Sequence, residues 1–252
     1  MKSKFTASGL SPTSIILLLM KVEEHDGIEL WDQIRRKVMA NSNSHSTSKL
    51  LTAGIIAGPF FAIVALAHAL MRQGFSIVRH PASMLSLGDL GWIQIANFVL
   101  TGIFFILCGI GLRQQLTTGI GSTWAPRLFT LFGIALVIGG VFTADPGLGF
   151  PPGSPEGPAT EMSWHGAIHA FAPIAGFMSL TVALFILARR FGSQGQRSWK
   201  YSTIIAAVVM FVLSAIPNFT ADWEKGVFNF LPLWAGTILG FGWTSLVIAK
   251  VK

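Results

Sequence analysis

The feature that most constrains this chain is a series of six long apolar stretches. They cover residues 50–71, 90–112, 126–144, 165–188, 201–219 and 228–249. Each has about the 20 residues that an α-helix needs to cross the hydrocarbon core of a bilayer. The apolar residues surround each predicted helix, and they do not alternate as the strands of a membrane barrel do. The pattern predicts an all-α polytopic membrane protein with six transmembrane helices in one bundle.

Composition agrees with a membrane protein and excludes other classes. Apolar residues make up 52% of the 252 residues and charged residues only 12%, against about 25% charged residues in soluble domains. The formal net charge is +7, but the basic residues lie in short loops and termini and form no face interleaved with aromatic side chains. We therefore expect no nucleic-acid partner. The single cysteine, Cys108, excludes an intramolecular disulfide and a cysteine-based metal site.

The charges between the apolar stretches predict the orientation of the chain in the cell membrane. One set of helix ends carries Lys49, Arg113, Arg127, Arg189, Arg190, Arg197, Lys200, Lys250 and Lys252, and the other carries only Arg72, Arg79 and Lys225. Basic residues are retained on the cytoplasmic side, so the first set should face the cytoplasm. Because the number of spans is even, both termini are then cytoplasmic.

The N-terminal residues are predicted to be separate from the membrane domain. We expect an extension over residues 1–48 and the six-helix domain over residues 49–252. The apolar run at residues 15–20 is too short to span a bilayer. Apolar residues from Ile28 to Val38 recur at helical spacing beside three basic residues, which is typical of an amphipathic helix at a membrane surface. A poorly ordered extension is the alternative.

Polar residues gather at the predicted outer ends of the spans, whereas the inner halves hold no carboxylate or histidine. Ionisable groups at membrane depth are costly and tend to face the bundle interior or a wet cavity. We therefore favour a non-enzymatic protein with an outward-facing polar pocket for a lipid or a small polar ligand. The candidate ligand-binding residues are Arg79, His80, Asp89, Asn97, Asp145, His165 and His169. Membrane lipids are the expected partners, and nothing in the sequence specifies an oligomeric state.

Three of these residues also suggest a metal site with a catalytic role. His165 and His169 are four residues apart and share one helical face, and Asp145 enters from the preceding antiparallel span. Two histidines and a carboxylate can hold zinc with an open position for water, which the metal would activate as a nucleophile. The alternative function is thus a metal-dependent hydrolase of a lipid-like substrate. A third interpretation is a structural scaffold, in which these residues only fasten two helices together.

The two predicted outer loops carry further expectations. Arg79 could pair with Asp145, or hold an anionic lipid headgroup or substrate. Ser86 or Asp89 is expected to cap the N-terminus of the second span, because each lies just before the apolar run. The loop at residues 145–164 contains five prolines and four glycines, too many for a regular helix. It is either a flexible connector or a stiff cover over the outer end of the bundle.

Small residues and tryptophans predict how the spans are held in place. Gly54 and Gly58, and likewise Gly236 and Gly240, have the spacing that lets two helices approach closely. We expect them to pack within the bundle rather than to form a dimer. Four tryptophans near the predicted outer ends are expected in the belt of aromatic residues at the membrane surface: Trp92, Trp164, Trp223 and Trp234.

Several short motifs together resemble one known family. They are Arg79-His80-Pro81, Ser86-Leu87-Gly88-Asp89-Leu90-Gly91-Trp92, Asn97-Phe98-Val99-Leu100-Thr101-Gly102, Thr143-Ala144-Asp145-Pro146 and His165-Gly166-Ala167-Ile168-His169. In this combination the chain resembles the domain-of-unknown-function 998 family over residues 50–250. The resemblance implies a bacterial-type integral membrane protein with six helices, and it implies no particular reaction.

Overall fold

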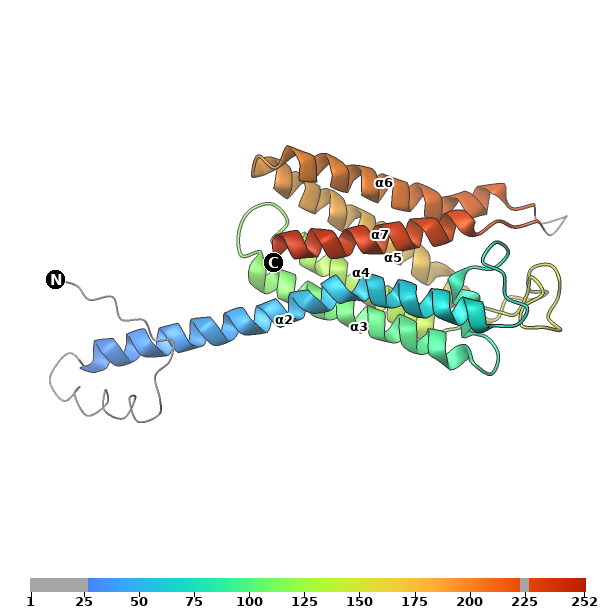
Figure 1. Ribbon diagram of the computed structural model, residues 1–252, viewed down its shortest axis with the longest axis horizontal. Coiled ribbons are helices and arrows are strands. Elements are labelled where there is room, and N and C mark those ends of the chain that lie inside the picture. Colours follow the sequence, from blue (N-terminus) through green and yellow to red (C-terminus); the bar gives the residue numbers. More distant parts are fainter. Residues whose placement is uncertain (1–26, 223–226) are drawn as a thin grey trace. The chain divides into compact units, whose positions relative to one another are not determined.

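The structure, a computed structural model, describes residues 27–222 and 227–252 (Figure 1). The predictions made for residues 1–26, including the short apolar run at residues 15–20, and for Trp223 lie outside the described residues. The chain divides into two compact units, Met1–His45 and Ser46–Lys252. The second unit holds the bundle of spans.

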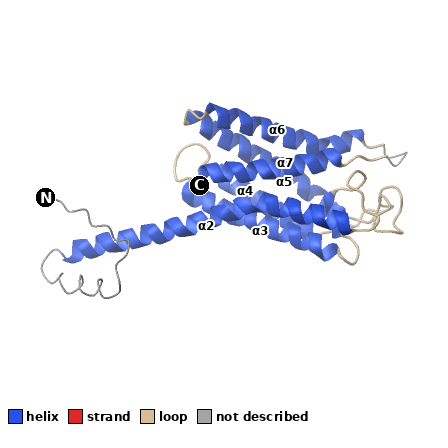
Figure 2. Ribbon diagram, viewed as in Figure 1, coloured by secondary structure: helices blue, strands red, loops and turns tan. Residues whose placement is uncertain are grey.

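Helices account for nearly all the regular structure of the described residues (Figure 2). In chain order they are α2 (Gly27–Met71), the short 3-10 helix η1 (Ala82–Ser86), α3 (Gly91–Gln115), α4 (Trp124–Val141), α5 (Trp164–Ser193), α6 (Arg197–Thr220) and α7 (Leu231–Val251). Six segments are long and apolar enough to cross a membrane, the first of them His45–Met71 within α2. The predicted all-α protein with six transmembrane helices is confirmed.

The first span differs from its prediction at its N-terminal end. Helix α2 begins at Gly27 and continues without a break into the span. The segment expected as an amphipathic helix is therefore helical, but it is the first part of α2 and not an element of its own. Its side chains at Trp31 and Val38 are exposed. Its location at a membrane surface stays a prediction.

Helices that are consecutive in the chain from α3 to α7 pack against each other, as short connections between antiparallel spans require. The Phe241 ring of α7 joins several of them at the centre of the bundle. Its centroid lies 5.2 Å from that of Phe61 in α2, 5.8 Å from Phe105 in α3 and 5.3 Å from Phe132 in α4. Such ring pairs add to the packing energy that holds helices together in lipid.

Glycines allow close approach of the helices within the bundle. A Cβ atom on Gly58 of α2 would lie 2.5 Å from the backbone carbonyl oxygen of Phe241, and one on Gly236 of α7 would lie 2.9 Å from Cβ of Leu213. Both positions are thus filled by neighbouring helices of the same chain. The expectation that these glycines pack within the bundle is confirmed.

The bundle has two chemically different ends. We call the end formed by residues 72–90, 142–163, 221–222 and 227–230 the loop end, and the opposite one the basic end. At the basic end Arg190 donates to the carbonyl oxygen of Thr118 at 2.8 Å, and Lys252 donates to the Thr52 hydroxyl at 2.9 Å. The cytoplasmic location of the basic end stays a prediction. Lys225, expected at the loop end, is outside the described residues.

The loop between α4 and α5 forms a packed cover on the loop end. Phe150 is fully buried, and its ring lies 5.2 Å from the Phe75 ring and 5.4 Å from the His80 ring. Within the loop, the Leu148 N–H donates to the carbonyl oxygen of Gly157 at 2.6 Å. The loop therefore has the packing of a cover, one of the two interpretations of its sequence. We call residues 145–163 the cover.

Candidate functional site

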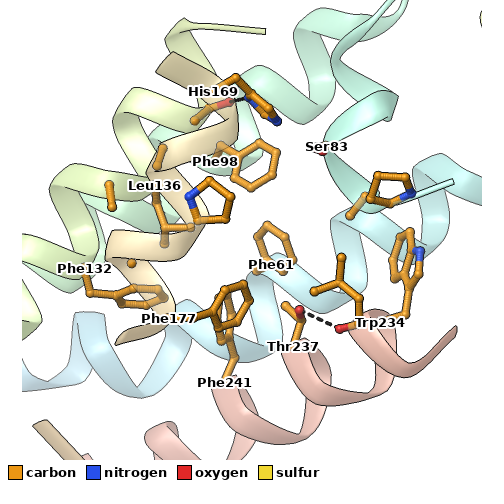
Figure 3. Close-up of a pocket in the computed structure, with 18 residues that line it drawn as sticks. Phe61, Ser83, Phe98, Phe132, Leu136, His169, Phe177, Trp234, Thr237 and Phe241 are labelled. Carbon is orange, nitrogen blue, oxygen red and sulfur yellow. Dashed lines mark hydrogen bonds between the residues drawn. The ribbon is translucent and has the colours of Figure 1, made fainter. Parts of the chain in front are cut away.

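A cavity of about 130 Å³ lies among the helices toward the loop end. Figure 3 shows the side chains that line it. They come from five of the spans and from the segment around η1. The main contributors are Phe61, Ser83, Phe98, Phe132, Leu136, His169, Phe177, Trp234, Thr237 and Phe241.

The lining of this cavity is almost entirely apolar. Five phenylalanine rings form much of its wall, and small residues form the rest where α4 faces α5. A Cβ atom on Gly176 of α5 would lie 3.3 Å from Cβ of Ala135 in α4. The cavity thus differs from the polar pocket predicted at this end of the bundle. The rings leave space because the small residues opposite them do not fill it.

His169 is the ionisable residue that lines the cavity. Its Nδ1 atom lies 3.1 Å from the carbonyl oxygen of Gly139 and 2.7 Å from that of Phe142, both at the C-terminal end of α4. Carbonyl oxygens only accept hydrogen bonds, so Nδ1 carries the hydrogen and a neutral ring has Nε2 as an acceptor. In Figure 3 the far side of the ring points toward the space between Phe98 and Ser83. The cavity thus contains an acceptor against an apolar wall.

Trp234 and His80 connect the cavity to the cover. The Trp234 ring lines the cavity, and its indole N–H donates to the carbonyl oxygen of His80 at 2.9 Å. The Nε2 atom of His80 lies 2.9 Å from the carbonyl oxygen of Leu148 in the cover. The expectation that Trp234 is an exposed interface residue is wrong, because its ring is only 5% exposed. Burial lowers the pKa of His80 from its ordinary value.

Asp145, predicted as part of a metal site, is bonded to the start of α5. Its carboxylate accepts from the Ser163 hydroxyl at 2.5 Å and from the Ser163 backbone N–H at 2.9 Å. The hydroxyl has one hydrogen, so its oxygen accepts from Nδ1 of His165 at 2.8 Å and from the Gly166 N–H at 3.0 Å. Ser163 is thereby the N-cap of α5. The hydrogen bond from the Ser163 hydroxyl holds the pKa of Asp145 below its usual value.

The three predicted metal ligands do not form one ligand set. Asp145 and His165 meet only through the Ser163 hydroxyl, and His169 directs Nδ1 to the backbone of α4. Throughout the part of the chain that the structure describes, no three His, Cys, Asp or Glu side chains are arranged to hold a metal ion. The geometry gives no support to the zinc interpretation. It matches the structural one, in which these residues fasten α4 to α5.

The other predicted ligand-binding residues lie outside the cavity. Arg79 pairs with Glu156 of the cover, with Nη2 2.7 Å from both the carboxylate Oε2 and the backbone oxygen. The expected pairing with Asp145 is therefore wrong, because the cover folds Glu156 over this guanidinium. Asn97 is buried and donates to the carbonyl oxygen of Phe61 at 3.1 Å. Asp89 is exposed. A ligand-binding role of these residues stays a prediction.

The predicted caps of α3 are also wrong. Leu90 occupies the N-cap position, and no side chain caps the helix. The chain turns at Gly88, whose φ of 72° favours glycine, and Gly91 then packs directly against the carbonyl oxygen of Ser86. Ser86 is buried within η1. This turn separates both predicted caps from the first turn of the helix.

Most of the residues that line the cavity were not predicted from the sequence. The apolar side chains of a span give no sign of which ones border a cavity and which ones face lipid. A usable signal was nevertheless present. Ala135 and Gly139 in α4, and Ala172 and Gly176 in α5, are pairs of small residues spaced by four, and they meet across the helix interface. Where two such pairs lie opposite a group of phenylalanines, the small side chains leave space beside the rings, which indicates a cavity.

The chain belongs to a known family that carries no assigned function. Residues 55–250 match the family described as protein of unknown function (DUF998). This match includes most of the first span, the next four spans completely and nearly all of the last one, and it confirms the resemblance carried by the sequence motifs. No curated protein and no solved structure matched the chain. The protein is thus an integral membrane protein of the DUF998 family.

Proposed function

We propose that this protein is a binding protein of the membrane, which holds the apolar part of a membrane-soluble molecule in the cavity beside His169. The observation that carries the proposal is the lining itself. Apolar side chains from several spans surround about 130 Å³ of space. Maintaining such space lowers the stability of a protein, because the surrounding atoms lose packing partners. A bound apolar group restores those contacts.

The volume indicates the size of the group that binds. An apolar cavity of about 150 Å³ in another protein takes up benzene. This cavity therefore suits one ring or a short part of an acyl chain, and the rest of the molecule extends from its open side. Pro173 of α5 lines the cavity and is exposed at the surface of the bundle. A ligand can thus reach the cavity from the bilayer.

The ring of His169 indicates which neutral molecules bind best. Its Nε2 atom accepts a hydrogen bond when Nδ1 is held by the carbonyl oxygens of Gly139 and Phe142. A ligand with a hydroxyl or amide N–H satisfies this acceptor, whereas a carboxylate or an ether does not. The favoured class is a neutral amphiphile with a hydrogen-bond donor, such as a long-chain alcohol. The hydrolase alternative has no comparable observation in its favour.

The proposed location is the cell membrane with both termini in the cytoplasm. Its support is the distribution of basic residues, which gather at the basic end of the bundle and are sparse at the loop end. The cavity lies toward the loop end, so it would be reached from the outer half of the bilayer.

Photolabelling of the purified full chain tests the binding proposal. The probe is a long-chain alcohol with a diazirine in its chain, and labelled sites are mapped by mass spectrometry. We expect labelling near Phe98 and Leu136 that an excess of unlabelled alcohol suppresses. The substitution Ala172→Leu fills the cavity and should lower this labelling at least tenfold. The control Ala175→Leu makes the same change at an exposed position of α5 and should leave it unchanged.

A second comparison tests the role of His169. The substitution His169→Leu removes the acceptor, and the net value of one hydrogen bond, about 1 kcal/mol, corresponds to an affinity about fivefold lower. The methyl ether of the same alcohol should bind both forms equally. If labelling near Phe98 persists in Ala172→Leu, or if unlabelled alcohol never competes, the cavity is not a binding site. The scaffold interpretation would then be favoured.

A further inference from the structure

A second group of buried polar atoms lies between α2, η1 and α3, and none of its residues lines the apolar cavity. His68 and Gln94 are fully buried, and Ser86 is 5% exposed. Within the described residues, both ring nitrogens of His68, Nε2 of Gln94 and Oγ of Ser86 have no hydrogen-bond partner. Leaving a buried polar atom unpaired costs about 1–3 kcal/mol. Several such atoms in one region point to a bound group.

Hydrogen bonds and backbone contacts place these side chains in one region at the loop end. His68 lies in the last turn of α2, and Arg72 is the first residue after the helix, four residues further along the chain. Arg72 donates from Nη2 to the carbonyl oxygen of Leu87 at 2.6 Å, next to Ser86 in the chain. The backbone of Gly91 packs against the Ser86 carbonyl group. Arg72 is thus joined to the segment that starts α3.

Gln94 faces the same region from α3. It lies one turn beyond Gly91, and its Oε1 accepts from Nδ2 of Asn97 at 3.3 Å. The same Nδ2 atom donates to the carbonyl oxygen of Phe61 in α2. Because Phe61 precedes His68 by two turns, the faces that carry His68 and Gln94 meet as the two antiparallel helices approach the loop end.

The unpaired atoms are mostly donors. The Gln94 Nε2 atom is an amide nitrogen, because Oε1 is the atom that accepts from Asn97. The Arg72 Nη1 atom is a positively charged donor and is also buried without a hydrogen-bond partner, although the guanidinium lies over the Phe150 ring at 5.0 Å. The Ser86 hydroxyl and the His68 ring each offer at least one further hydrogen. Asp89, the carboxylate whose charge acts on Arg72, is exposed to solvent. A group that only accepts hydrogen bonds matches this set.

We propose that His68, Arg72, Ser86 and Gln94 form a binding site for a small anionic acceptor, either a free halide ion or the carboxylate of a membrane-soluble acid. Both sources offer the same chemistry, a compact negative charge without hydrogens to donate. Charged hydrogen bonds from a guanidinium and an amide are the interactions that hold such groups in buried sites. The site is independent of the apolar cavity, which favours a neutral donor.

The test measures the Tm of the full chain in a nonionic detergent. The salt is changed from sodium gluconate, whose anion is too large for a buried site, to chloride, acetate or octanoate at constant ionic strength. We expect a saturable rise in Tm, because a ligand that binds only the folded state stabilises it. A rise with chloride identifies a halide site. A rise with octanoate at much lower concentration than acetate identifies the carboxylate of a membrane-soluble acid.

Matched variants assign the effect to these residues. Gln94→Leu removes the amide donor at nearly constant volume, and Ser86→Ala removes only the hydroxyl. Each should weaken the apparent affinity at least tenfold, whereas the exposed control Gln73→Leu should leave it unchanged. If Gln94→Leu does not fold, the affinity of Ser86→Ala alone tests whether the anion binds at this site. Equal Tm values in all four salts would mean that only ordered water fills the site, and equal salt dependence in Ser86→Ala would place the anion elsewhere. Either result overturns the proposal.

Discussion

Single histidines near the loop end differ in the tautomer that their backbone partners require. His80 accepts from the backbone N–H of Ser76 through Nδ1 at 3.0 Å, so the hydrogen is on Nε2, which donates to Leu148. His169 has the opposite arrangement, with its hydrogen on Nδ1. The two rings are therefore specialised in different ways. His80 has both nitrogens occupied by the fold, whereas His169 keeps one nitrogen for the cavity.

The tautomer of His80 predicts that the fold loses stability in acid. Burial depresses its folded pKa, with a smaller contribution from the charge of Arg79, and this outweighs the opposing effects of the Leu148 hydrogen bond and Glu156. The stabilisation is complete above the unfolded pKa of about 6.5 and is lost as the pH falls through the folded pKa. Protonation of Nδ1 also breaks the bond from Ser76. The Tm should therefore fall between pH 7 and pH 5.

The substitution His80→Gln isolates this residue, because glutamine keeps a donor for Leu148 but does not titrate. At pH 8 it should cost about 1–2 kcal/mol through the lost hydrogen bond and ring packing. Its Tm should then change less between pH 7 and pH 5 than that of the unaltered chain, as measured by circular dichroism in detergent. Parallel pH curves for the two proteins would show that other groups cause the acid sensitivity.

Residue roles could be predicted only where helix geometry alone decides them. The meeting of Asp145 and His165 follows from two antiparallel helices joined by one loop. Their shared partner Ser163 did not follow, because an N-cap depends on where the helix begins. The pairing of Arg79 with Glu156 depends on how a loop rich in proline and glycine folds, and no periodic pattern describes such a loop.

At the scale of elements, the six spans were predicted well because an apolar run of this length has few alternatives to a membrane helix. Their ends were predicted less well. Polar residues such as Lys49 and Arg113 continue a helix beyond the hydrocarbon core, and hydropathy does not register them. The start of α3 is set by the positive φ of Gly88. That conformation is local and has no signature in the apolar pattern.

Packing between α2 and α7 predicts opposite effects for two glycine substitutions. A methyl group at Gly58 would lie 2.5 Å from the Phe241 carbonyl oxygen, and backbone atoms cannot move aside without separating the helices. Gly58→Ala should destabilise the bundle by about 1–3 kcal/mol. The same change at Gly242 meets no atom within 4 Å and should stabilise α7 by about 0.5–1 kcal/mol. Tm measurements in one detergent compare the two, and equal shifts would contradict this view of the interface.

At the scale of the whole molecule, the bundle separates two kinds of chemistry along its length. The basic end holds most of the arginines and lysines of the membrane domain, whereas the loop end holds the cover, the cavity and the buried polar group. The charge asymmetry was evident in the sequence, because the order of the spans is enough to assign each loop to one end of the bundle. The cavity was not evident in the sequence, because its position depends on how side chains from different helices pack in three dimensions.

This asymmetry gives the last prediction, which concerns the side of the membrane that each end faces. Single cysteines are introduced at Thr160 in the cover and at Ser193 at the end of α5, both exposed, in a chain with Cys108 replaced by alanine. In intact cells an impermeant thiol reagent should label the cysteine at 160 and not the one at 193. After the membrane is permeabilised, both should react. The expectation rests on basic residues being retained in the cytoplasm. Labelling at 193 alone in intact cells would mean that the bundle is inverted, and that its cavity opens toward the inner half of the bilayer.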